Sequence, residues 1–93
     1  MALDKQGQRI AIEVKTFATV SPITDLHRAI GQYMFYDVLL KEVDPIRLIF
    51  LAVDEKTFGG VFSEPIGELM RNRLAMRIVI FNAEQQRITR WIS

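Results

Sequence analysis

The sequence feature that most constrains the fold is an uninterrupted apolar run from Leu48 to Val53. Its aromatic and β-branched residues, and the absence of alternation, predict a central strand that is covered on both faces. The run is far too short to cross a membrane, which takes about 20 apolar residues. We therefore expect a sheet that carries this strand in its interior.

A second strand is predicted over residues 8–17, where β-branched residues alternate with polar ones. One face of this strand is apolar, and the other face includes two charged residues, Glu13 and Lys15. The four residues at 4–7, Asp-Lys-Gln-Gly, are typical of a turn.

A helix is predicted from Pro22 to about Glu42. Ser21 is a suitable N-cap, Pro22 suits the first helical position, and Asp44-Pro45 ends the helix. An apolar stripe at helical spacing should face the core. It consists of Ile23, Leu26, Ile30, Tyr33 and Leu40.

The second half of this helix has more apolar residues than one face needs. Phe35, Val38 and Leu39 widen the apolar surface beyond the stripe. We expect this half to be buried on more than one side, by its own sheet or by another subunit.

The rest of the chain completes an α/β pattern. A short helix or turn is expected at 54–62, a helix at 64–74, strands at 77–81 and 87–92, and a hairpin at 82–86. The order β-α-β-α-β-β predicts a mixed sheet flanked by helices, with a crossover between strands. With 93 residues and no linker, we expect residues 1–93 to form a single domain.

Composition excludes several kinds of site. The chain has no cysteine and a single histidine, His27, which excludes disulfides, thiolate zinc sites and multi-histidine metal centres. Its net charge of +1 neither indicates nor excludes a nucleic-acid partner. The N-terminus does not resemble a signal peptide, so we expect a cytoplasmic protein without membrane association.

The first candidate site is Glu13-x-Lys15 on the predicted strand. Residues two apart on a strand point to the same side, so the two charges lie together. A carboxylate there can hold a divalent cation, and the ammonium beside it can orient a water or neutralise a phosphate. Taken alone, the pattern is more typical of an ordinary solvated strand face.

The second candidate is Gln32-x-x-x-Tyr36 on the long helix. Residues four apart share a helix face, and Asp25 lies two turns earlier on about the same side. A glutamine there can meet Lys15 or a substrate phosphate. Taken alone, this pattern is more typical of a polar border with a half-buried tyrosine.

Together, the two patterns resemble the PD-(D/E)xK nuclease superfamily, and the Gln-x-x-x-Tyr element resembles its RecB-type branch. A closer resemblance, to the XisH family, extends from about residue 3 to residue 92. These proteins are the fdxN-element excision controlling factors of cyanobacteria. The matching segments are Ile-Ala-Ile-Glu-Val-Lys-Thr-Phe (10–17), Asp25-Leu26, Ala-Ile-Gly-Gln-Tyr (29–33), Leu-Ala-Val (51–53) and Trp91-Ile92.

The resemblance implies a restriction-endonuclease-like fold and a role in programmed DNA excision, with XisI as a companion protein. It implies that Glu13 and the Val14 carbonyl hold Mg²⁺, and that Lys15 is the catalytic lysine. Gln32 and Tyr36 would be the supporting motif.

The chain departs from the superfamily pattern at the first acid, an aspartate on the strand paired with the Glu-x-Lys strand. With the turn centred on residues 6–7, Glu13 lies opposite position 0, while Asp4 falls beside the turn. The aspartate should therefore lie upstream of Met1. We expect the first strand and an N-terminal helix to be missing, through a truncated or misassigned reading frame or natural shortening.

The missing strand has two expected consequences. One carboxylate and one carbonyl make a poor Mg²⁺ site, because this ion takes six oxygen ligands. The unpaired edge of strand 8–17 invites another chain, which predicts a homo-oligomer. Two functions remain open: an accessory factor in DNA element excision, and an active Mg²⁺-dependent DNA endonuclease whose aspartate comes from elsewhere.

Overall fold

The computed structural model describes residues 2–5, 8–15 and 21–92, with side chains from residue 10 onward. Helices and strands follow the predicted order β-α-β-α-β-β after one additional short strand. Their bounds are β1 (Ala2–Lys5), β2 (Gln8–Val14), α1 (Pro22–Val43), β3 (Leu48–Asp54), α2 (Glu55–Gly59), the 3₁₀ helix η1 (Val61–Ser63), α3 (Pro65–Arg73), β4 (Ile78–Asn82) and β5 (Arg87–Ile92).

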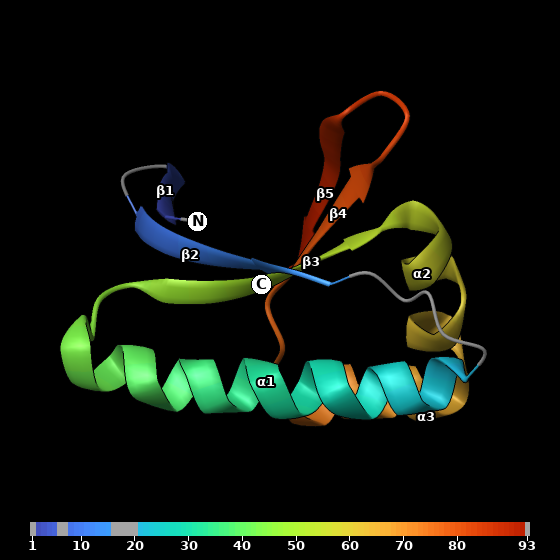
Figure 1. Cartoon of the computed structure of the whole chain (residues 1–93), viewed down its shortest axis with the longest axis horizontal. Coiled ribbons are helices and arrows are strands. Elements are labelled where there is room, and N and C mark those ends of the chain that lie inside the picture. The colour runs from blue at the N-terminus through green and yellow to red at the C-terminus, as the bar shows by residue number, and fades with distance from the viewer. Residues whose placement is uncertain (1, 6–7, 16–20, 93) are drawn as a thin grey trace.

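The strands form one mixed sheet in the order β1-β2-β3-β4-β5. The three central strands β2, β3 and β4 are parallel, and each outer strand is antiparallel to its neighbour. Figure 1 shows α1 and α3 on the same side of this sheet, with the β4–β5 hairpin extending away from them. The mixed α/β class predicted from the sequence is confirmed.

The beginning of the chain differs from the prediction. A turn was predicted over residues 4–7, but Ala2–Lys5 forms strand β1 and pairs with residues 8–11 of β2. A strand paired with β2, which we expected to be missing, is therefore present over residues 2–5. Short polar segments such as Asp4-Lys5 carry little strand signal of their own, and pairing with β2 supplies the missing stabilisation.

The central strand β3 is buried on both faces, as its unbroken apolar sequence predicted. Leu51 and Val53 belong to the core between the sheet and the helices, whereas Phe50 and Ala52 belong to a smaller cluster on the opposite face. Trp91 of β5 packs edge-on against Phe50, with 5.2 Å between ring centroids.

The long helix α1 begins as predicted. The Ser21 side chain caps it by accepting from the Thr24 N–H, and Pro22 occupies the first turn. Leu26 and Tyr33 of the predicted stripe are buried, and Ile30 and Leu40 pack against the same core. Ile23 is exposed, because it lies at the first turn, beyond the main core.

The second half of α1 is not buried within the chain. Phe35 is 62% exposed, Val38 61% and Leu39 49%, so the expectation that the chain's own sheet covers them is wrong. The sheet covers only the side of α1 that carries Leu26, Ala29 and Tyr33. Burial by a second subunit, the other predicted source, stays a prediction.

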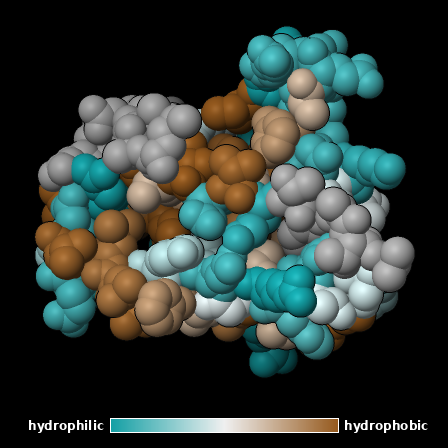
Figure 2. Space-filling model, in the orientation of Figure 1, coloured by the Kyte–Doolittle hydropathy of each residue, from teal (hydrophilic) through white to brown (hydrophobic). Residues whose placement is uncertain are grey.

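The sheet face opposite the helices is also partly open. A groove of about 340 Å³ runs between the ends of β2 and the β4–β5 hairpin. Its lining is mostly apolar: Ile12, Val14, Ala52, Val79, Phe81 and Ile88, with Gln86 and Arg87 at the hairpin. Figure 2 shows apolar residues over this face between β1 and the hairpin. None of the described helices is long and apolar enough to span a membrane.

Candidate functional site

Glu13 and Lys15 lie together at the end of β2, as their spacing predicted. Their side chains point toward the helix layer, and Lys15 Nζ lies 3.5 Å from Glu13 Oε1. The Glu13 side chain is 33% exposed and that of Lys15 is 23% exposed, so both remain within reach of solvent and of a ligand. The pair forms because β2 carries the two residues on one side of its pleat.

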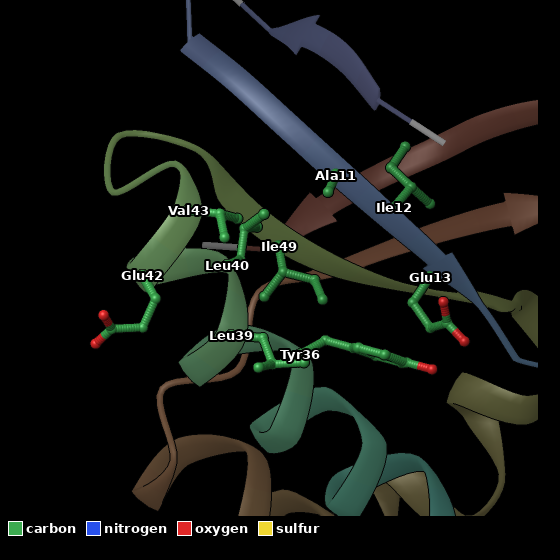
Figure 3. A pocket seen from close by; sticks show the side chains of 9 residues that line it. All are labelled: Ala11, Ile12, Glu13, Tyr36, Leu39, Leu40, Glu42, Val43 and Ile49. Carbon is green, nitrogen blue, oxygen red and sulfur yellow. The ribbon is translucent and has the colours of Figure 1, made fainter.

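A pocket of about 440 Å³ opens beside Glu13, between β2 and α1. Apolar residues make up most of its wall: Ala11, Ile12, Leu39, Leu40, Val43 and Ile49. Glu13 lies at one end of the pocket and Glu42 at the other. The pocket is therefore a largely apolar groove with the Glu13 carboxylate at one end, whereas the Glu42 carboxylate points away from it (Figure 3).

Tyr36 is the residue of α1 that approaches Glu13 most clearly. Its ring lies along the pocket, and its hydroxyl points toward the end that holds the Glu13 carboxylate (Figure 3). The other member of the predicted motif, Gln32, is exposed and does not line this pocket. The structure thus brings together Glu13, Lys15 and Tyr36, and leaves the Gln32 side chain in solvent.

Asp25 lies in the first turn of α1 and is 7% exposed, the single buried charged residue among those the structure describes. Its burial was not foreseen from the sequence, which placed it only on the same helix side as Gln32 and Tyr36. It does not line the pocket beside Glu13.

The Val14 carbonyl faces the open edge of β2. The Lys15 N–H donates to the Ala52 carbonyl of β3 at 3.0 Å. Because successive residues of a strand direct their backbone groups to alternate sides, those of Val14 point away from β3. The described pairing with β1 ends at Ala11, so this stretch of edge has no partner strand among the described residues.

The observed register determines which position of the β1 side lies opposite Glu13. Ala2 pairs with Ala11 and Asp4 with Arg9, so the position opposite Glu13 lies one residue ahead of Met1. Asp4 is beside the turn, as counted from the sequence. No described residue of β1 can therefore place a carboxylate opposite Glu13.

Comparison with known proteins decides the family. Residues 1–89 match the family model described as XisH protein. The chain belongs to the XisH family. A comparison with curated proteins gives no match.

Two solved structures support the same assignment. An XisH family protein from Nostoc punctiforme is 32% identical, with a TM-score of 0.93 over 99% of this chain and 73% of that one. A fdxN element excision controlling factor protein from Anabaena variabilis is 33% identical, with a TM-score of 0.92 over 99% of this chain and 72% of that one. The fold of the XisH chain is thus shared with experimental structures along nearly its whole length.

The oxygen donors that the structure describes in this XisH chain do not by themselves fit a magnesium ion. Among the described residues, no three Asp, Glu, His or Cys side chains gather where they could hold a metal. The candidate ligands are the Glu13 carboxylate and the Val14 carbonyl, whereas Mg²⁺ takes six oxygens in near-octahedral geometry. A further carboxylate is needed before metal chemistry can be assigned to this site.

Proposed function

We propose that this XisH-family chain has a PD-(D/E)xK nuclease-like fold and acts in, or controls, programmed excision of DNA elements as an accessory factor. The observation that carries the proposal is the Glu13–Lys15 pair on β2, which has a nuclease-like arrangement but a single carboxylate. The similarity to a fdxN element excision controlling factor supports the process in which it acts.

The accessory role rests on the charge balance of the site. Lys15 already neutralises Glu13 at 3.5 Å, and no group of three or more Asp, Glu, His or Cys side chains that could hold a cation gathers among the described residues. Without a cation, a lone Glu–Lys pair has little means of stabilising the charge that develops on a phosphodiester during hydrolysis. The site is then better suited to binding a partner than to catalysis.

An active Mg²⁺-dependent DNA endonuclease is the second candidate. The observations that favour it are the Val14 carbonyl at the open edge of β2 and Tyr36 pointing toward Glu13. In this function Glu13 and Val14 hold the ion, and Lys15 orients a water or neutralises the phosphate. Gln32 and Tyr36 support the site, and an aspartate from outside the described residues completes it.

The proposed partners are DNA, a companion protein of the XisI type and further copies of the chain. Arg71 and Arg90 favour the first, because both guanidinium groups lie over the Phe58 ring, at 5.1 and 5.8 Å from its centroid. Neither has a carboxylate within salt-bridge distance among the described residues. Arg71 Nε donates to the Phe62 carbonyl at 3.1 Å, whereas Arg90 is exposed, so Arg90 is the better placed of the two to meet phosphate. Two open apolar surfaces, on α1 and on the helix-free sheet face, are available for proteins.

An excision assay separates the two functions. In Anabaena variabilis cells that lack their own excision controlling factor, the wild-type chain should restore the rejoined DNA junction, measured by PCR. The accessory role predicts that Glu13→Gln restores it equally well. The matched surface control is Glu84→Gln, an exposed carboxylate in the turn between β4 and β5 that does not line the pocket beside Glu13.

The outcomes are distinct. Loss of the junction with Glu13→Gln but not with Glu84→Gln would favour the endonuclease. Failure of the wild-type chain itself, when its expression is verified, would contradict any role in excision.

A further inference from the structure

Two arginines from different elements converge on one aromatic ring. The guanidinium carbon of Arg71, on α3, lies 5.1 Å from the centroid of the Phe58 ring on α2, and that of Arg90, on β5, lies 5.8 Å from it. Phe58 in turn stacks on the fully buried Phe62 of η1, with 6.2 Å between ring centroids. A ring anchored to the core thus holds two cations near each other, and we call Arg71 and Arg90 the arginine pair.

The charge of the arginine pair is not balanced by the part of the chain that the structure describes. Neither guanidinium group has a carboxylate within salt-bridge distance there. Contact with the face of the Phe58 ring attracts each guanidinium group but leaves its charge in place. The two like charges therefore repel each other, and an anion that contacts both relieves this repulsion.

The arginine pair keeps hydrogen-bond donors for such an anion. Arg71 Nε donates to the Phe62 carbonyl at 3.1 Å, which fixes the half-buried side chain and leaves its two Nη groups without a partner among the described residues. The Arg90 side chain is exposed. Planar guanidinium groups bind two phosphate oxygens at once, through hydrogen bonds that are stronger than those between neutral groups. The arginine pair is therefore suited to a phosphate group.

Arg90 lies on the same line across the sheet as Lys15. By the register of β2 and β3, Lys15 is level with Val53. Val53 pairs with Ile80 of β4, and Ile80 pairs with Arg90. Because Val53 and Ile80 belong to the core under the helices, this line runs along the helix side of the sheet. Three strand spacings of about 4.8 Å separate its ends, so the backbones of Lys15 and Arg90 lie roughly 14 Å apart.

This line runs close to the carboxyl ends of the parallel strands. β2 ends at Val14, β3 at Asp54 and β4 at Asn82. Figure 1 shows α2, which carries the aromatic ring, at the end of β3 and beside the β4–β5 hairpin. Ligands of open sheets with parallel strands bind outside these carboxyl ends. The arginine pair and the Glu13–Lys15 pair therefore share the edge of the sheet where a ligand is expected.

We propose that the arginine pair is a phosphate-binding site, and that the phosphate belongs to a nucleic-acid backbone which continues along this edge toward Lys15. One strand of a DNA duplex advances about 3.4 Å per nucleotide, so the separation of roughly 14 Å corresponds to about four nucleotides. A repeating phosphate satisfies the cations at both ends of the line, whereas a free phosphate satisfies one end. The inference rests on the proposed partnership with DNA and adds where the backbone lies.

The test is binding of a short fluorescein-labelled DNA duplex to the chain, followed by fluorescence anisotropy at a series of salt concentrations. Arg90→Gln should weaken binding about tenfold and lower the slope of log affinity against log salt concentration by about 0.9, because one phosphate contact is lost. Arg90→Lys should keep the wild-type slope, because it keeps the charge. The matched control is Arg73→Gln, at an exposed arginine on α3 that has no described contact with the Phe58 ring. It should leave affinity and slope unchanged.

Competition identifies the source of the phosphate. An unlabelled duplex should displace the labelled one, whereas inorganic phosphate and polyglutamate at the same concentration of negative charge should not. Displacement by inorganic phosphate would assign the site to a free phosphate, and displacement by polyglutamate would assign it to an acidic protein. Either result would overturn the proposal, as would equal effects of Arg90→Gln and Arg73→Gln or a wild-type chain that does not bind DNA.

These outcomes are distinct from those of the excision assay. If the wild-type chain restores the rejoined junction while its affinity for DNA does not depend on Arg90, the phosphate site is refuted and the role in excision stands. If DNA binding depends on Arg90 but the junction is not restored, the phosphate site stands and the role in excision is refuted.

Discussion

Arg77 and Asp37, which are 40 residues apart in sequence, form an ion pair in which Arg77 Nη2 lies 3.1 Å from Asp37 Oδ1. Arg77 precedes β4, and Asp37 lies on α1. The Arg77 Nε also donates to the Ile49 carbonyl of β3 at 3.0 Å, and its backbone N–H donates to the Tyr33 hydroxyl at 3.1 Å. One arginine therefore connects the long helix to two central strands.

We expect Asp37→Ala to destabilise the fold by about 1–3 kcal/mol, because it leaves the Arg77 guanidinium, whose side chain is 21% exposed, without its carboxylate. Lys41 also contacts Asp37, at 3.0 Å, but is 65% exposed, so Lys41→Ala should cost less than about 1 kcal/mol. Urea unfolding of both variants checks this. Equal losses in the free energy of unfolding would mean that the Arg77–Asp37 ion pair does not stabilise the fold.

The two tyrosines of α1 should respond differently to loss of the hydroxyl. Tyr33 is 2% exposed and its hydroxyl accepts the Arg77 N–H, so Tyr33→Phe leaves a donor unpaired and should cost about 1–2 kcal/mol. Tyr36 is 39% exposed and lines the pocket. Tyr36→Phe should change stability by no more than about 0.5 kcal/mol in the same unfolding experiment. The reverse order of these two effects would contradict the assigned hydrogen bond.

Gly67 permits the contact between α3 and η1. A Cβ atom at this position would lie 1.9 Å from the Val61 carbonyl oxygen and 2.7 Å from the Phe62 Cα, both of them backbone atoms. Gly67→Ala should therefore cost about 3 kcal/mol or more. Gly31→Ala on α1 is the control. An added Cβ there would meet no heavy atom within 4 Å apart from its own helix backbone and chain neighbours, so the change should stabilise the helix by about 1 kcal/mol. Thermal unfolding distinguishes the two directions.

The parts of the fold with strong local signals could be predicted from the sequence. Ser21 and Pro22 define the start of α1, and the unbroken apolar sequence of Leu48 to Val53 marks the central strand. The pairing of Glu13 with Lys15 follows from strand alternation alone. In each case the information lies within a few residues.

Features that depend on distant contacts could not be predicted. Strand β1 exists through its pairing with β2, and the burial of Asp25 depends on how α1 packs. Helical spacing identified Phe35, Val38 and Leu39 as apolar, but only the placement of the sheet shows that they are uncovered. The same placement brings Tyr36 toward Glu13 and leaves Gln32 in solvent.

The most direct test of the central claim, an accessory factor with a nuclease-like half-site, is a plasmid-cleavage assay in Mg²⁺ and in Mn²⁺. An accessory factor should leave supercoiled DNA intact, so the wild-type chain should give the same result as Glu13→Ala. Metal-dependent nicking by the wild-type chain that disappears in both Glu13→Ala and Lys15→Ala would contradict it and establish an endonuclease.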